Sequence, residues 1–163
     1  MAAKLNSMRL LEQHRIPYEA ITYADAGTFH SADDVAALLG VPPETVYKTL
    51  VVEPAGGGKP ALALIAAGRS LDLRLMAAAL GVKKVSMAAH KDAERLTGLQ
   101  VGGISPLALT QKNWPVYLDQ PAAALEQILI SAGQRGTQVR LPTAALIALL
   151  RARVAAISAP PAG

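Results

Sequence analysis

The sequence contains no cysteine among its 163 residues. This absence excludes a disulfide framework, a thiolate metal site and a cysteine nucleophile. Aromatic residues are also scarce, with one Phe and one Trp, so we do not expect a broad platform that stacks several nucleobases. No stretch reaches the roughly 20 apolar residues of a membrane span. The three histidines lack the spacing of metal ligands, and we expect neither a metal nor a cofactor.

The composition is that of a compact globular protein, 52% hydrophobic and 17% charged. The net charge of +4 permits contact with a polyanion without requiring it. Polar residues interrupt the first residues, MAAKLN, which therefore lack a signal-peptide core, and we expect a cytoplasmic protein. The length fits one domain. We expect this domain to span residues 1–157 and a disordered tail to follow at 158–163.

Hydrophobic periodicity predicts short helices that alternate with short strands. The expected helices cover 4–15, 32–39, 72–80, 90–97 and 143–153, with Ser31 as an N-cap and glycines after three of them as C-caps. The expected strands cover 18–23, 46–52, 60–66, 83–87, 102–104, 116–118, 128–131 and 138–141. This order favours the α/β (α+β) class over a doubly wound parallel sheet.

Lys48 stands in a hydrophobic run, Val46 to Val52. A lysine in a buried strand carries a desolvation cost of several kcal/mol unless it meets an anion or a cavity. One reading is an edge-strand lysine whose ammonium reaches water. The other is a fixed cation that faces a phosphate or a developing oxyanion.

The segment VGGISP, residues 101–106, places Gly102 and Gly103 where a strand is expected. Paired glycines in a strand indicate either a bulge or a close approach to the backbone. In the second case their N–H groups could face a carbonyl oxygen, with Ile104 and Ser105 beside it. A later segment, SAGQRG, has the pattern of a tight turn, but Ser131, Gly133 and Arg135 could also form the wall of a pocket.

These three segments, in this order and at these spacings, resemble the YbaK/EbsC family of free-standing aminoacyl-tRNA deacylases. That family is similar to the editing domain inserted in bacterial prolyl-tRNA synthetases. The resemblance covers nearly the whole chain except the tail. It implies a single domain with a curved, mixed and largely antiparallel sheet and helices around it.

The resemblance also implies the activity, which is hydrolysis of a mischarged aminoacyl-tRNA, with Cys-tRNA(Pro) as the leading candidate and prolyl-tRNA synthetase as a possible partner. It makes Lys48 the residue on which activity depends. The positions that fall on the pocket of the family are Tyr23, Thr49, Gly102, Gly103 and Ser131. Oligomeric state stays open.

Two positions depart from the family pattern. Ser31 stands where relatives have a pocket-lining Phe, for which Phe29 could substitute, and Gln138 replaces an acidic residue. Both changes concern the pocket wall and therefore the choice of amino acid. Two alternatives to a deacylase follow: a module that binds aminoacyl-tRNA or a nucleotide without hydrolysis, and an adaptor that docks on a partner protein.

Overall fold

The computed structural model describes residues 4–24 and 30–160. Its strands are Glu19–Thr22 (β1), Tyr47–Pro54 (β2), Ala61–Ala66 (β3), Ser70–Leu71 (β4), Val85–Met87 (β5), Val116–Asp119 (β6), Gln127–Ser131 (β7), Thr137–Pro142 (β8), Arg153–Ala155 (β9) and Ser158–Ala159 (β10). Its α-helices are Asn6–Gln13 (α1), Ala32–Leu39 (α2), Leu73–Leu80 (α3), His90–Thr97 (α4) and Thr143–Leu150 (α5). None of these helices is long and apolar enough to cross a membrane.

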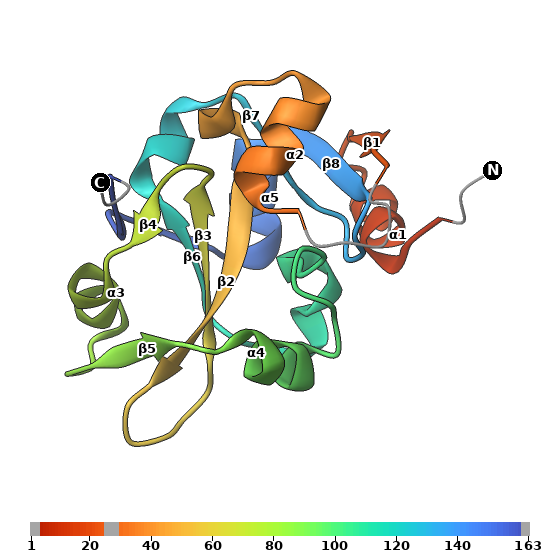
Figure 1. The fold of residues 1–163 in the computed structure, drawn as a ribbon. Helices are drawn as coiled ribbons and strands as arrows, with labels where there is room; N and C mark the ends of the chain where they lie inside the picture. The colour runs from red at the N-terminus through yellow and green to blue at the C-terminus, as the bar shows by residue number, and fades with distance from the viewer. Residues whose placement is uncertain (1–3, 25–29, 161–163) are drawn as a thin grey trace.

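The strands form a five-stranded sheet in the order β5-β2-β3-β6-β9 and a three-stranded sheet in the order β1-β8-β7, with β4 paired to β10 (Figure 1). The β3–β6 and β6–β9 pairs are parallel, and the remaining strand pairs are antiparallel. The expected mixed, largely antiparallel architecture with surrounding helices is therefore confirmed.

The core lies on both faces of the five-stranded sheet. All six residues of β3 are buried, as expected for a strand with both faces covered. On one face Ala63 and Ile65 pack with Met76 of α3. On the other face Leu62 and Leu64 join a larger cluster that includes α1, β7 and β8. Figure 1 shows α3 and α1 on opposite sides of this sheet.

Capping residues fix three helices as the sequence predicts. Ser31 accepts the Asp34 N–H, and the Asp34 carboxylate accepts the Ser31 N–H, so that α2 begins with a capping box. Gly40, Gly81 and Gly98 follow α2, α3 and α4 in the left-handed conformation, which costs glycine least.

Several sequence predictions are wrong in detail. Residues 102–104 form a turn and loop instead of a strand. The helix expected over 143–153 stops at Leu150, because Arg151 adopts a left-handed φ of 51° and β9 follows. The first helix is also shorter than its expected range, 4–15.

The tail prediction is wrong for its first two residues. Ser158 pairs with Leu71, and Ala159 pairs with Ser70. The Asp119 carboxylate holds this segment as well, because it accepts the Ile157 N–H at 3.0 Å and a hydrogen bond from the Ser158 hydroxyl. The end of the expected tail, 161–163, lies outside the described residues.

Candidate functional site

A cavity of about 220 Å³ opens beside the first half of β2, on the edge that pairs with β5 only from Val52 to Pro54. Val46 forms a parallel bridge to Leu129 of β7. Beyond this bridge the cavity lies between the two strands, with the start of α2 and the 101–104 segment around it. Six of the predicted site residues line it: Ser31, Lys48, Thr49, Gly102, Ile104 and Ser131.

Thr49 faces the cavity with its backbone as well as its side chain. The Val46 carbonyl accepts the Ala67 N–H on the β3 side of β2, and the Val51 carbonyl accepts the Ala88 N–H on the other side. Backbone groups alternate between the two edges of an antiparallel strand. The N–H and C=O of Thr49 therefore point away from β3, toward the cavity.

Lys48 supplies the positive charge of the cavity. Its side chain is half-buried, and burial lowers the pKa of its ammonium, while Asp33 partly opposes this effect. Among the described residues no carboxylate lies within ion-pair distance of the Lys48 Nζ. The lysine thus carries a desolvation cost without a close counter-ion, as expected where a ligand supplies the anion.

The two glycines of the 101–104 segment have different roles. Gly102 lines the cavity with a left-handed φ of 93°, and among the described residues its N–H has no hydrogen-bond acceptor. Gly103 does not line the cavity, and its N–H donates to the Gln100 carbonyl at 2.8 Å. The prediction that Gly103 offers a free amide is therefore wrong.

Gly103 is instead required for packing. A Cβ at this position would lie 2.8 Å from the backbone N of Arg135 and 2.8 Å from Cα and C of Gln134. Ordinary carbon contacts are about 3.5–4.0 Å. The absence of a side chain therefore lets the glycine segment lie directly against the 133–136 turn.

Arg135 and Glu94 hold the glycine segment in place. The Arg135 Nε donates to the Val101 carbonyl at 2.7 Å, and the Val101 N–H donates to the Glu94 carboxylate at 2.9 Å. Arg135 does not line the cavity. We therefore infer that Arg135 positions the loop and does not contact a ligand directly. The sequence prediction that Arg135 forms part of the pocket wall is corrected in this respect.

Two further predicted residues also act locally. The fully buried Ser105 caps a 3-10 turn, because its Oγ accepts the Leu107 N–H at 3.1 Å. Gly133 donates its N–H to the Ser131 Oγ at 3.2 Å. Neither Ser105 nor Gly133 lines the cavity, so the structure does not support direct binding by either.

Tyr23 lies one residue layer from the cavity. Its ring meets the His30 ring edge to face, with centroids 6.2 Å apart, and His30 lines the cavity. Tyr23 therefore packs against a lining residue and does not itself line the cavity. The alternative aromatic, Phe29, lies outside the described residues.

The cavity wall includes polar atoms that lack partners. Four lining residues have a buried polar atom without a hydrogen bond among the described residues: His30 Nε2, Tyr47 Oη, Thr49 Oγ1 and Gln138 Oε1. Buried polar atoms are nearly always paired in native proteins, so this concentration favours a polar ligand. Burial is also the main reason that the pKa of Tyr47 rises to about 12.

Sequence reasoning missed several of these lining residues, among them His30, Asp33, Tyr47 and His90. Asp33 had the pattern of a helix-start acid, and His90 does begin α4. Gln138, which the resemblance placed in the pocket wall, does line the cavity and lies opposite Ser131 in the β7–β8 ladder. Tyr47 belongs to β2 itself and precedes Lys48, whereas His30, Asp33 and His90 reach the cavity through the packing of the α2 and α4 starts near β2.

Comparison with known families identifies this arrangement. A model of the aminoacyl-tRNA editing domain matches residues 27–149. The chain belongs to this family. The matched region includes the lysine strand, the glycine segment and the Ser131 turn, which confirms the resemblance predicted from the motifs.

Individual relatives agree with the assignment to the aminoacyl-tRNA editing domain family. The "Putative Cys-tRNA(Pro)/Cys-tRNA(Cys) deacylase EbsC" of Enterococcus faecalis is 39% identical over 155 residues, which are 95% of this chain and 93% of that protein. A proline–tRNA ligase of Geobacter metallireducens is 32% identical over 82 residues, which are 50% of this chain and 14% of the ligase.

Solved structures share the fold of this editing domain. One, a "putative trans-editing enzyme for prolyl tRNA synthetase", superposes with a TM-score of 0.78 over 97% of this chain and 99% of its own, at 22% identity. Another, a hypothetical protein, has a TM-score of 0.84 over 94% of this chain and 99% of its own, also at 22% identity.

Proposed function

We propose that this protein hydrolyses the ester of a mischarged aminoacyl-tRNA in trans, with Cys-tRNA(Pro) as the leading substrate. The observation that carries the proposal is that a half-buried Lys48 and Gly102, whose N–H has no acceptor among the described residues, line one cavity. Four other lining residues have a buried polar atom without a partner there. Membership of the aminoacyl-tRNA editing family supports it, as does the name of the 39% identical relative.

The chain offers no thiol nucleophile, since it contains no cysteine. The Oγ atoms of Ser31 and Ser131 each accept a local N–H. The attacking atom is therefore a water oxygen or the sulfur of a cysteinyl substrate. Its bond to the ester carbon forms and the bond from that carbon to the ribose oxygen breaks. The proton of the nucleophile passes to the released ribose oxygen, which becomes a hydroxyl.

Lys48 and Gly102 stabilise the negative charge that develops on the carbonyl oxygen. A single preorganised donor of this kind contributes on the order of 100-fold or more in rate. The left-handed backbone at Gly102 directs its N–H without requiring a side chain, and burial strengthens the field of the Lys48 ammonium.

Thr49 and Gln138 bind the amino-acid part of the substrate. Their unpaired Oγ1 and Oε1 atoms accept hydrogen bonds from the substrate α-ammonium or its side chain. Gln138 is 95% buried, with 5% of its surface exposed, so pairing its oxygen recovers a desolvation cost of about 1–3 kcal/mol. The pocket wall at Ser31 and Gln138 selects the amino acid.

The test is deacylation of a panel of labelled aminoacyl-tRNAs led by Cys-tRNA(Pro) and Ala-tRNA(Pro), with wild-type protein, Lys48→Ala and the control Lys59→Ala. Lys59 is exposed at the far end of the β2–β3 hairpin. We expect loss of the ester with wild type and Lys59→Ala but not with Lys48→Ala. If the protein retards aminoacyl-tRNA on a gel and leaves every ester intact, it is a binding module and the proposal is wrong.

A further inference from the structure

A second cavity of about 280 Å³ adjoins the first on the α3 side of the sheet. Lys48 and Leu50 line both cavities. These two residues lie on one face of β2, two positions apart, and Ile65 is the cross-strand partner of Lys48. The Lys48 and Leu50 side chains therefore form a wall that the two cavities share.

The second cavity combines an apolar wall with exposed apolar side chains. Leu50, Ile65 and Leu71 form part of the wall, and Leu73 and Met87 stand at the rim. Leu73 is 43% exposed and Met87 is 51% exposed. Exposed apolar residues that gather beside a polar site are typical of a surface that a ligand covers.

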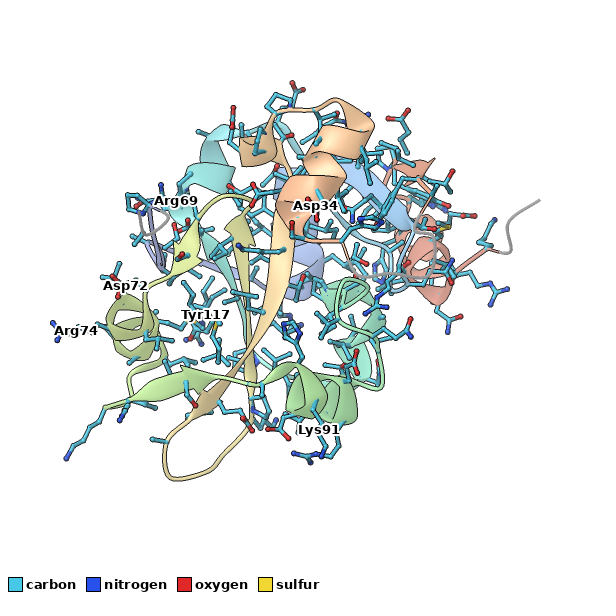
Figure 2. All side chains as sticks on the ribbon, viewed as in Figure 1. Asp34, Arg69, Asp72, Arg74, Lys91 and Tyr117 are labelled. Carbon is cyan, nitrogen blue, oxygen red and sulfur yellow. The ribbon has the colours of Figure 1, made fainter. Side chains whose placement is uncertain are left out.

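Arg69 gives the second cavity a fixed cation. Its Nε donates to the Ser158 Oγ at 2.7 Å, and that hydroxyl donates to the buried Asp119 carboxylate. Among the described residues the two terminal amino groups of Arg69 have no hydrogen-bond partner. Figure 2 places Arg69 beside β4, on the same side of the molecule as α3. One edge of the guanidinium is anchored and the other stays available for an anion.

We propose that this second cavity binds the 3′-terminal nucleotide of the aminoacyl-tRNA: the adenine contacts the apolar wall and Arg69 binds a phosphate. This inference rests on the proposed function, which places the ester beside Lys48. The ribose joins the ester to the base and the phosphate, so these groups must leave the first cavity through an adjacent opening. The second cavity provides that opening, with apolar surface for the base and positive charge for the phosphate.

Titration of ¹⁵N-labelled protein with adenosine 5′-monophosphate, followed by NMR, tests the subsite. We expect saturable shifts at residues 48–50, 69–73 and 87, with a dissociation constant on the order of 1 mM. Ribose 5-phosphate should bind about tenfold more weakly, because it lacks the base. Shifts confined to other parts of the protein, or none at all, overturn the proposal.

Charged substitutions at the rim provide the control. Leu73→Glu and Met87→Glu should each weaken the mononucleotide about tenfold or more, because they place a carboxylate beside the base and the phosphate. Leu75→Glu is the matched control: Leu75 is on the same helix and 41% exposed, but it does not line the cavity. Equal affinity in Leu73→Glu, Met87→Glu and Leu75→Glu overturns the assignment.

The two proposals fail in different ways. Mononucleotide binding at this cavity with no ester hydrolysed would overturn the deacylase and leave the nucleotide subsite. Hydrolysis of aminoacyl-tRNA with no mononucleotide binding at this cavity would overturn the nucleotide subsite and leave the deacylase.

Discussion

The substitution Gly103→Ala tests whether the glycine segment is held by packing. The added Cβ would lie 2.8 Å from three backbone atoms of Gln134 and Arg135, and backbone atoms cannot rotate away as a side chain can. Either the glycine segment or the 133–136 turn must move by several tenths of an ångström or more. Strain of this kind costs about 1–3 kcal/mol, which corresponds to a fall of roughly 2–12 °C in melting temperature for a domain of this size.

The same movement should affect activity. It displaces the Gly102 N–H, because the Arg135–Val101 and Gly103–Gln100 hydrogen bonds hold this segment at the cavity. A misplacement near 1 Å can cost about 100-fold in rate. We therefore expect Gly103→Ala to unfold at a lower temperature in calorimetry and to deacylate roughly 10- to 100-fold more slowly.

Gly98→Ala is the control, because Gly98 has a left-handed φ of 75° and no atom within 4 Å of an added Cβ. It should lose about 1–2 kcal/mol through backbone strain alone and retain full activity. A Gly103→Ala protein that melts and reacts like wild type would refute the packing argument. Unchanged stability with lost activity would instead return Gly103 to a direct role in catalysis.

Three other substitutions test separate parts of the structure. Lys48→Met should melt at a higher temperature than wild type at pH 7, because burial of the ammonium lowers its pKa and the unfolded chain binds that proton more tightly. In wild type the stability should therefore rise with pH between this lowered pKa and the ordinary value near 10.4, and Lys48→Met should lack this rise in denaturation curves. Gln138→Met removes an unpaired buried oxygen, so the unfolding free energy of this variant should stay within about 1 kcal/mol of wild type. Its KM for aminoacyl-tRNA should rise. A large loss of stability would mean that the oxygen has a protein partner. Asp119→Ala leaves the Ile157 N–H and the Ser158 hydroxyl without an acceptor and should lower the free energy of unfolding by about 2–4 kcal/mol. Backbone amides at 157–159 should exchange their hydrogens faster. Exchange as slow as in wild type would refute the anchoring role.

Local signals in the sequence determined most of the secondary structure. Ser31, Gly40, Gly81 and Gly98 mark helix ends because caps depend on nearest neighbours, and all four act as predicted. The glycine turn at 56–58 likewise joins an antiparallel hairpin. The motifs around Lys48, Gly102 and Ser131 identified the family and five residues of the cavity, and the comparison with the family pattern added Ser31.

Tertiary packing decided what local patterns could not. The 102–104 segment has the apolar and glycine content of a strand, but the hydrogen bonds of the preceding Val101 to Arg135 and Glu94 hold the chain there as a loop. Residues 158–159 look like a tail in sequence, yet β4 and the Asp119 carboxylate order them.

The division between sequence and structure follows from the range of the forces involved. Caps and turns depend on a few adjacent residues, so the sequence alone places Ser31 and the helix-ending glycines. The approach of Gly103 to Arg135, the burial of Gln138 and the meeting of two cavities at Lys48 depend on residues far apart in the chain. Only the folded chain brings these groups within the few ångströms over which packing and hydrogen bonds act.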